Sequence, residues 1–540
     1  MTLRRLGAGC AFALLAAWLP VSASAGSKDP QTKAFVYCSE ASPESFNPQL
    51  SIANTTFDAS SRNVYNRLVE FERGTTTLRP ALAESWAISP DGLVYTFHLR
   101  HNVAFHTTPW FTPTRPFNAD DVLYSFQRQW DPNHPDHALS GGTYEYFNSM
   151  DMPKLIKAIE KIDDYTVRFV LSQPEAPFLA NLAMDFASIL SAEYAAAMHA
   201  AGTPEKIDLQ PVATGPFQFV SYQKDAIIRF KANPDYWQGK PAIDTLIFSI
   251  TPDPAVAYAK LKAGECQLIP YPNPSDLSAM RRDPEIRVMS QEGLNVGYLA
   301  FNTQKPPFDD VRVRRALDLA INKDAIIAAV YQGEGRKAKN PIPPTMWSYN
   351  DAVKETAYDP EAARRLLAEA GHAGGFTTDI WALPVTRPYN PDGRRMAEMI
   401  QADWAEVGVR ARIVSYEWGE FLKRTKAGEH QTMLFGWIGD NGDPDNFLYV
   451  LLSCVAAKDG TNRARWCNAD FDDVVTRAKR TTDIAERSRL YQQAQVIFKQ
   501  QIPWVTIAHS VVSTAMSTAV KNYKIDPLGG HIFNGVDLAD

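Results

Sequence analysis

GRRMAEMIQADWAEVGVRARIV, residues 393–414, joins a helix pattern directly to a strand pattern. The part up to Gly408 predicts a helix, and Gly408 predicts its end because glycine readily adopts the left-handed conformation found there. Residues 409–413 then alternate apolar side chains with arginines, which is the two-residue period of a half-buried strand. A helix, a glycine and a strand in this order are typical of an α/β fold, in which helices cover the faces of an open mixed sheet.

Similar patterns extend over much of the chain. After a turn signal at 89–92, Tyr95, Phe97 and Leu99 alternate with polar residues and predict a strand. The length of 540 residues suggests two to four domains of about 150 residues each. Because neither an internal repeat nor a low-complexity linker is visible, we expect packed lobes that meet at a cleft, where ligand sites often form.

The composition excludes several classes of protein. Hydrophobic residues make up 45% and charged residues 21% of the chain, as in ordinary globular proteins. The net charge of −6 and the lack of a basic run argue against a nucleic-acid-binding protein. No G-x-S-x-G, H-E-x-x-H or P-loop motif occurs. We therefore expect a binding protein without catalytic residues, metal or cofactor, and an exported peptidase is the remote alternative.

The amino terminus has the three parts of a secretion signal. Two arginines at positions 4 and 5 precede an apolar stretch at 6–21, and residues 23–25 form a small-x-small cleavage site. We predict cleavage after Ala25, so that residues 1–25 are a signal peptide and the mature chain stays in a periplasm. An uncleaved anchor is the alternative. No later stretch approaches the ~20 consecutive apolar residues of a membrane-spanning helix.

Four cysteines follow the signal: Cys38, Cys266, Cys454 and Cys467. An even number in an oxidising compartment favours two disulfides. Cys454 and Cys467 form the natural local pair, which leaves Cys38 with Cys266. A zinc site made of all four thiolates is the alternative, although the usual CxxC spacing is missing.

Two loops carry candidate binding residues. Arg387 stands between two prolines in residues 381–391, which restricts the local backbone. Residues 435–447 follow a strand-like run and combine glycines and aromatic residues with three acids, Asp440, Asp443 and Asp445. An acid on one loop and an arginine on the other could hold the opposite charges of one zwitterion. A surface arginine and a solvated acidic turn are the alternative interpretation.

Many separated segments resemble one known family. They are VYCSE at 36–40, FNPQ at 46–49, YNRLVEF at 65–71, YTFHLR at 95–100, NADDV at 118–122, TGPF at 214–217, LNVGY at 294–298 and NKDAII at 322–327, together with the two loops above. On these segments the chain resembles the family 5 extracellular solute-binding proteins of ABC importers, over essentially all of the mature sequence.

The resemblance implies an α/β fold with three lobes, that of a class C (type II-like) periplasmic binding protein. Two mixed-sheet lobes would be hinged around a ligand cleft, and an extra α+β lobe would complete the molecule. Lobe I would be discontinuous, at 26–64, 211–292 and 511–540, with lobe II at 65–210 and lobe III at 293–510. The family's two disulfides match Cys38–Cys266 and Cys454–Cys467.

The resemblance also implies a function. The protein would capture dipeptides by their charged termini and deliver them, as a monomer that does not span the membrane, to the permease subunits of an ABC transporter. Asp440 would bind the ligand ammonium group and Arg387 the ligand carboxylate. Further ligand-binding residues would be Pro388, Tyr389, Trp418, Trp437, Ile438, Gly439, Ile52 and Asn54. At 52–54 the sequence departs from the small and hydroxyl residues of the family's dipeptide binders. Haem or another peptide-like cargo is the alternative ligand.

Overall fold

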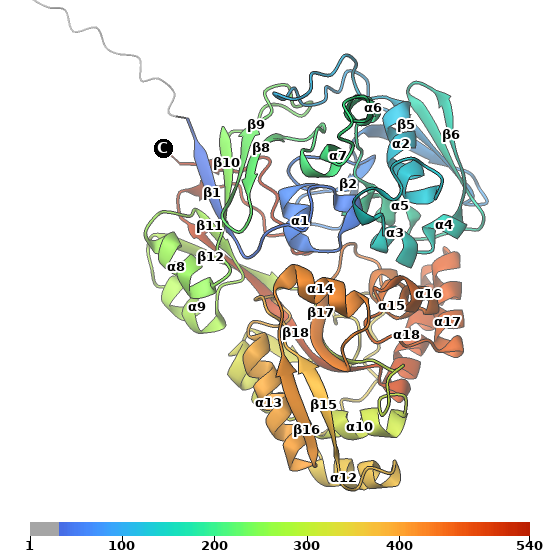
Figure 1. The fold of residues 1–540 in the computed structure, drawn as a ribbon, viewed down its shortest axis with the longest axis vertical. Helices are drawn as coiled ribbons and strands as arrows, with labels where there is room; N and C mark the ends of the chain where they lie inside the picture. The colour runs from blue at the N-terminus through green and yellow to red at the C-terminus, as the bar shows by residue number, and fades with distance from the viewer. Residues whose placement is uncertain (1–31, 540) are drawn as a thin grey trace, which may run out of the picture. The chain divides into compact units, whose positions relative to one another are not determined.

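The computed structural model describes residues 32–539. The predicted signal peptide, residues 1–25, and the first residues of the predicted lobe I lie outside the described residues. Figure 1 shows two regions of mixed sheet and helix, with the helices placed on the faces and at the ends of the sheets. Within residues 32–539, no helix is both long and apolar enough to cross a membrane.

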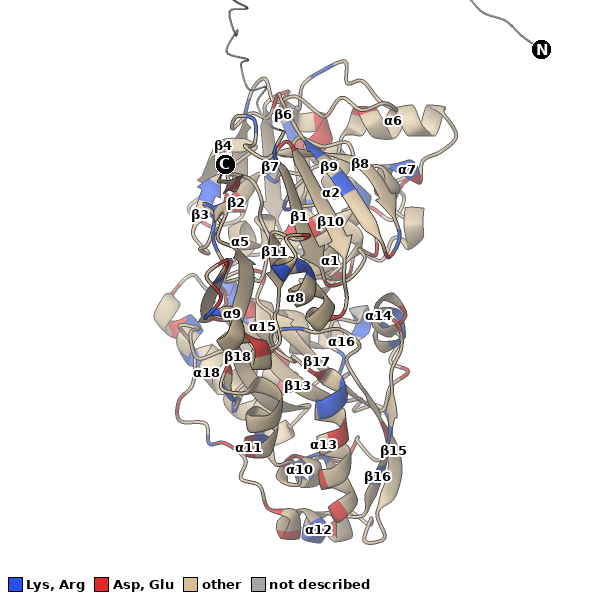
Figure 2. Ribbon diagram, turned by 90° about the vertical axis from the view of Figure 1, so that its left-hand side faces the viewer, with Lys and Arg blue, Asp and Glu red and all other residues tan. Residues whose placement is uncertain are grey.

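The stretch at 393–414 forms the predicted helix and strand, α13 (Gly393–Glu406) and β16 (Val409–Val414). Gly408 lies between them with a φ of 86°, in the left-handed region. β16 pairs in parallel with β15 (Phe376–Trp381), and α13 packs against this pair (Figure 2). The expected α/β fold with mixed sheets is therefore confirmed.

Twelve strands belong to one mixed sheet. Its order is β16-β15-β17-β13-β18-β11-β1-β10-β9-β8, and β12 and β14 also pair with β18. The strands not yet given are β1 (Ala34–Ser39), β8 (Phe217–Gln223), β9 (Ile227–Ala232), β10 (Thr245–Ile250), β11 (Leu268–Pro270), β12 (Ile286–Glu292), β13 (Asn295–Phe301), β14 (Gly335–Lys337), β17 (Thr432–Ile438) and β18 (Trp504–Ser517).

The long strand β18 connects the two halves of this sheet (Figure 1). Its residues 504–508 pair with β13, and its residues 511–517 pair with β12. The predicted lobe boundary between residues 510 and 511 therefore falls inside a continuous strand. The predicted boundary between residues 292 and 293 falls at the end of β12. The chain thus passes between the two halves once within β18 and once through the two residues between β12 and β13.

A second sheet is antiparallel and lies within residues 65–210. Its order is β4-β5-β7-β6, made of β4 (Ala83–Ile88), β5 (Val94–Leu99), β6 (Ile156–Asp163) and β7 (Thr166–Leu171). In β5 the predicted alternation is confirmed, since Tyr95, Phe97 and Leu99 are buried. Two short ladders pair β2 (Val69–Phe71) with β3 (Leu78–Pro80) and β19 (Val520–Lys521) with β20 (Asp537–Leu538).

The helices cover these sheets and fill the space between them. Several begin at a capping side chain: Asp359 accepts a hydrogen bond from the backbone N–H of Ala362 at the start of α12. The helices are α1 (Asn54–Ala59), α2 (Ala119–Trp130), α3 (Glu145–Ser149), α4 (Met152–Leu155), α5 (Phe178–Leu182), α6 (Ala192–Ala200), α7 (Lys206–Leu209), α8 (Pro254–Lys262), α9 (Pro274–Met280), α10 (Val311–Leu319), α11 (Lys323–Ile326), α12 (Pro360–Glu369), α14 (Trp418–Lys426), α15 (Asp445–Leu452), α16 (Cys454–Asp459), α17 (Ala469–Arg480) and α18 (Ile484–Gln501).

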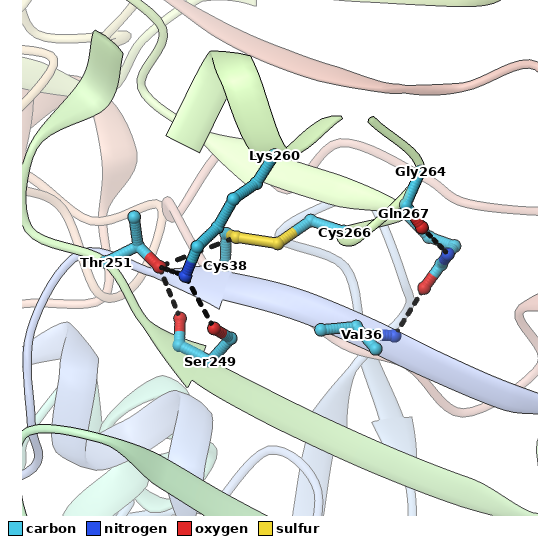
Figure 3. The surroundings of a disulfide bond; sticks show 8 residues. All are labelled: Val36, Cys38, Ser249, Thr251, Lys260, Gly264, Cys266 and Gln267. Carbon is cyan, nitrogen blue, oxygen red and sulfur yellow. Dashed lines mark hydrogen bonds between the residues drawn. A yellow bond between two sulfur atoms is a disulfide. The ribbon is translucent and has the colours of Figure 1, made fainter. Parts of the chain in front are cut away.

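Both predicted disulfides are present. Cys38 on β1 is bonded to Cys266, with 5.8 Å between their Cα atoms, and Cys454 to Cys467, with 4.6 Å. Figure 3 shows the first bond beside Lys260 of α8, whose Nζ donates to the hydroxyls of Ser249 and Thr251. The four-thiolate zinc alternative is excluded because all four sulfur atoms are used in disulfides.

Candidate ligand-binding site

A cavity of about 450 Å³ lies where segments from both halves of the main sheet and from residues 65–210 meet. One wall comes from the segment before and at the start of α1, and α3 contributes one tyrosine. The opposite wall comes from the loop after β15, from α14 and from β17 with its following loop. The lining residues are Ile52, Ala53, Asn54, Tyr146, Arg387, Tyr389, Trp418, Leu422, Phe435, Gly436, Trp437, Ile438 and Asp440.

Eight of the ten ligand-binding residues predicted from the sequence line this cavity. The other two lie beside it. Pro388 lines a neighbouring cavity that shares Arg387, and its carbonyl accepts a hydrogen bond of 2.6 Å from the Ser510 hydroxyl. Gly439 donates its backbone N–H to the carbonyl of Leu294 at 2.7 Å. Through these hydrogen bonds, both residues help to hold the two loops that carry lining residues.

Arg387 is held by a short rigid loop. Its backbone N–H donates to the carbonyl of Asn390 at 3.1 Å, and the N–H of Asn390 donates back at 2.9 Å. The loop can lie against the sheet because β13 and β17 carry glycines at the contact. A Cβ at Gly297 would be 2.1 Å from the carbonyl oxygen of Tyr389, and a Cβ at Gly436 would be 2.2 Å from the Tyr389 ring.

The guanidinium of Arg387 is buried and only partly satisfied. Its Nη1 donates to Glu40 Oε1 at 2.9 Å, and the group lies 4.8 Å from the Trp418 ring centre, a cation–π contact. Its Nη2 is buried without a hydrogen-bond partner among the described residues. Burial lowers the pKa of Arg387, but Glu40 and neighbouring tyrosines more than offset this and raise it overall. Arg387 thus stays charged and keeps one donor group unused.

Asp440 is the acidic group of the cavity. Tyr146 donates its hydroxyl to Oδ2 of Asp440, and the Asp440 backbone N–H donates to Asn446 Oδ1 at 2.9 Å. Between residues 32 and 539, no cationic side chain forms an ion pair with Asp440. Burial raises the pKa of its carboxyl group to about 7. A cation placed in the cavity would therefore stabilise the ionised form.

The structure separates Asp440 from the other two acids of its loop. Asp443 is 2.8 Å from Arg487 of α18, and its charge is neutralised there. Asp445 is buried at the start of α15, where burial raises its pKa to about 6 and the charge of Lys479 partly opposes this. Only Asp440 of the three lines the cavity.

The two predicted tryptophans are both buried and both line the cavity. Trp437 donates its ring N–H to Asn446 Oδ1 at 3.0 Å, and its ring lies 5.8 Å from that of Tyr146. Asn446 thus fixes both the Trp437 ring and the Asp440 backbone. Trp418 stacks near Phe421 and Phe435 and carries Arg387 on its face.

Sequence reasoning placed Ala53, Phe435 and Gly436 in candidate binding segments without singling them out, and it missed the lining residues Tyr146 and Leu422. It also missed Glu40, the partner of Arg387, although Glu40 ends the segment VYCSE that the resemblance uses. Tyr146 and Asp440 are 294 residues apart, and Glu40 and Arg387 are 347 apart. No local pattern reports contacts over such separations.

Two sheet-bearing halves joined by a shared strand, with a buried charged cavity where they meet, define a binding protein of the periplasmic type. Residues 77–459 match the family described as bacterial extracellular solute-binding proteins, family 5 Middle. The chain belongs to this family.

Relatives of known name cover nearly the whole chain. The dipeptide-binding protein of Escherichia coli is 60% identical over 508 residues, which are 94% of this chain and 95% of the relative. The heme-binding protein A of Haemophilus influenzae is 53% identical over 524 residues, 96% of each chain. The crystal structure of a dipeptide-binding protein from Pseudoalteromonas sp. SM9913 in complex with Met-Leu superposes with a TM-score of 0.91 at 41% identity, covering 94% of this chain and 100% of that one.

Proposed function

We propose that this protein captures dipeptides in the cavity by their two charged ends and hands them to the permease subunits of an ABC importer. The observation that carries the proposal is the pair of charged groups in one cavity. Among residues 32–539, Asp440 forms no ion pair with a cationic side chain, and Nη2 of Arg387 has no hydrogen-bond partner. The names of the Escherichia coli and Pseudoalteromonas relatives support it.

The chemistry of a dipeptide suits these two groups. Its ammonium group has three donors, of which Asp440 accepts one or two. Its carboxylate accepts from Arg387 Nη2, in a charge-assisted hydrogen bond. Because Glu40 occupies Nη1, the ligand shares the guanidinium and does not take both of its terminal nitrogens. Exclusion of water from the cavity strengthens both contacts and makes any unpaired charge costly.

Side chains of the ligand would lie against the aromatic wall. Trp418, Trp437 and Phe435 offer apolar area without demanding one polar partner, which suits a site that accepts many sequences. Asn54 Oδ1 accepts from Arg62 Nη2 at 3.0 Å, so this oxygen is already used within the protein. Ile52 lines the cavity and would offer the ligand apolar surface, while the N–H and the carbonyl of Ala53 are used within the protein.

We further propose the lobe division 26–64, 211–292 and 511–540 for lobe I, 65–210 for lobe II and 293–510 for lobe III. The ligand would contact lobes I and III together and so favour a closed arrangement over an open one. The strands β12, β13 and β18, where the chain crosses between lobes I and III, would carry the hinge. The amino-terminal signal pattern supports export to the periplasm and cleavage after Ala25, and we propose that the protein acts there as a monomer.

Haem is the second candidate, since one relative is named for it. Protein haem ligands are mostly histidine, cysteine, methionine or tyrosine. Among the described residues that line the cavity, none is histidine, cysteine or methionine. Of the two lining tyrosines, Tyr146 already donates its hydroxyl to Asp440, and burial raises the pKa of Tyr389 to about 12, which disfavours the ionised form that would bind iron. The lining therefore favours a peptide, and a Soret band in the purified protein would contradict this.

The test is native mass spectrometry of protein purified without denaturation, followed by calorimetric titration of ligand-free protein. We expect co-purified ligands with dipeptide masses, and binding of Ala-Leu but not of N-acetyl-Ala-Leu, which lacks the ammonium group. Equal binding of the acetylated ligand would overturn the role of Asp440. Absence of binding by any dipeptide would overturn the function.

A further inference from the structure

Glu40 lies directly behind the arginine of the cavity. It follows the last residue of β1, and the backbone there is fixed by the N–H of Thr251, which donates to the carbonyl of Ser39 at 2.7 Å. Oε1 of Glu40 accepts from Arg387 Nη1 at 2.9 Å, and its Oε2 accepts from the Tyr37 hydroxyl at 3.4 Å. Glu40 is only 6% exposed, so water does little to screen its charge.

The ion pair between Arg387 and Glu40 changes the net charge of the site in which a ligand binds. Arg387 is the only basic residue among the described residues that line the cavity, and Asp440 is the only acidic one. With Glu40 included, the site carries one positive and two negative groups once Asp440 is ionised. A zwitterionic dipeptide adds no net charge, so the loaded site keeps one negative charge in excess.

Two arginines near the cavity do not correct this excess, because each is already paired. Arg62, whose charge acts on Asp440, is 2.8 Å from Asp58 and 3.4 Å from Asp185. Arg463, which lies 5.9 Å from the ring centre of Phe435, is 3.0 Å from Glu145. These two arginines therefore offer no free positive charge to a second ligand carboxylate.

We propose that Glu40 makes the cavity select dipeptides by net charge, so that neutral and cationic dipeptides bind in preference to those with an acidic side chain. This inference rests on the proposed function and names the ligand class within it. In a site that water screens poorly, an excess negative charge disfavours a further carboxylate strongly enough to change affinity by about tenfold or more. Glu40 acts through Arg387 and is a positioning residue that sets specificity.

The test compares ligands that differ in charge but not in shape. Ala-Glu and Ala-Gln are titrated calorimetrically into wild-type protein, Glu40→Gln and a control, Glu70→Gln. Glu70 is a similarly buried acid that also accepts from an arginine, Arg79, at 3.1 Å, but Arg79 does not line the cavity, whereas Arg387, the partner of Glu40, does. General damage to the site lowers both affinities together, whereas loss of charge selection changes their ratio.

We expect wild type and Glu70→Gln to bind Ala-Gln at least about tenfold more tightly than Ala-Glu, and Glu40→Gln to bring the ratio below about threefold. A wild-type ratio near one, or an unchanged ratio in Glu40→Gln, overturns the inference while dipeptide binding stands. If Glu40→Gln does not fold, wild-type protein is titrated with Ala-Lys and Ala-Met instead. Weaker binding of Ala-Lys than of Ala-Met would also overturn the inference. Failure of all these dipeptides to bind wild type is the separate outcome that removes the proposed function.

Discussion

Tyr146 donates its hydroxyl to Oδ2 of Asp440, although the two residues are 294 positions apart. The bond joins α3 to the loop after β17 and gives Asp440 a neutral donor, whereas no cationic side chain between residues 32 and 539 forms an ion pair with it. Hydrogen bonding from Tyr146 lowers the pKa of Asp440, but burial acts more strongly in the other direction and leaves it at about 7. The ligand-free site is therefore close to half protonated at neutral pH.

Dipeptide affinity should depend on pH between 5 and 7. An ammonium ligand needs ionised Asp440, so below about pH 7 binding must expel a proton, and affinity should fall about tenfold per pH unit. The ligand termini stay charged over this range. Calorimetry at pH 5, 6, 7 and 8 checks this, with Asp440→Asn as a control that binds weakly at every pH. Constant wild-type affinity from pH 5 to 8 would contradict the assigned role.

Replacing Asp440 should weaken binding yet stabilise the ligand-free fold at pH 8. The folded pKa of about 7 lies above the unfolded value, so the stability that Asp440 contributes when neutral is lost as pH rises from about 4 to about 7. Asp440→Asn keeps an acceptor for the Tyr146 hydroxyl and removes the buried charge, so the free energy of unfolding should rise by up to about 4 kcal/mol at pH 8. Thermal unfolding of ligand-free protein measures it.

Asp443→Asn is the matched control for that experiment. Asp443 belongs to the same loop but is paired with Arg487 at 2.8 Å, so its replacement should lower stability and not raise it. Equal shifts in the same direction for both variants would show that Asp440 is not a strained charge.

Removing Arg387 should cost both affinity and stability. Arg387→Ala takes away the donor for the ligand carboxylate, and affinity should fall at least about tenfold. It also leaves Glu40 buried without its partner, which costs about 3–5 kcal/mol. In the double variant Glu40→Gln, Arg387→Ala, stability should largely return while binding stays weak. Urea unfolding and calorimetry separate the two effects, and recovery of binding in the double variant would contradict the assignment.

Local sequence patterns predicted helices and strands, whereas contacts between residues far apart in the sequence determine which residues form the site. Gly408 marks the end of one helix and Asp359 the start of another, because the backbone conformation or capping bond responsible involves only a few neighbouring residues. The choice among three acids in one loop could not be made that way. It depends on Arg487 and Lys479, which α18 and α17 bring to Asp443 and Asp445 and not to Asp440.

The passage of the chain between the two halves of the main sheet was not predicted for the same reason. The crossing between lobes was expected at residue 510, from the resemblance alone, yet β18 continues from Trp504 to Ser517. Its pattern is one of nearly unbroken burial, so no change of period marks the place where its partner changes from β13 to β12. Only the pairing shows that one strand serves both halves.

Gly436 should be needed for the position of Tyr389. A Cβ there would stand 2.2 Å from a ring carbon of Tyr389, too close for any side chain, so Gly436→Ala must displace the ring or the loop that carries Arg387. We expect dipeptide affinity to fall by about tenfold, together with a stability loss of about 1–3 kcal/mol. Gly374→Ala is the control, because nothing lies within 4 Å of the Cβ it would gain. If Gly436→Ala binds dipeptides as tightly as the control, the observed position of Tyr389 is not required for binding the ligand carboxylate.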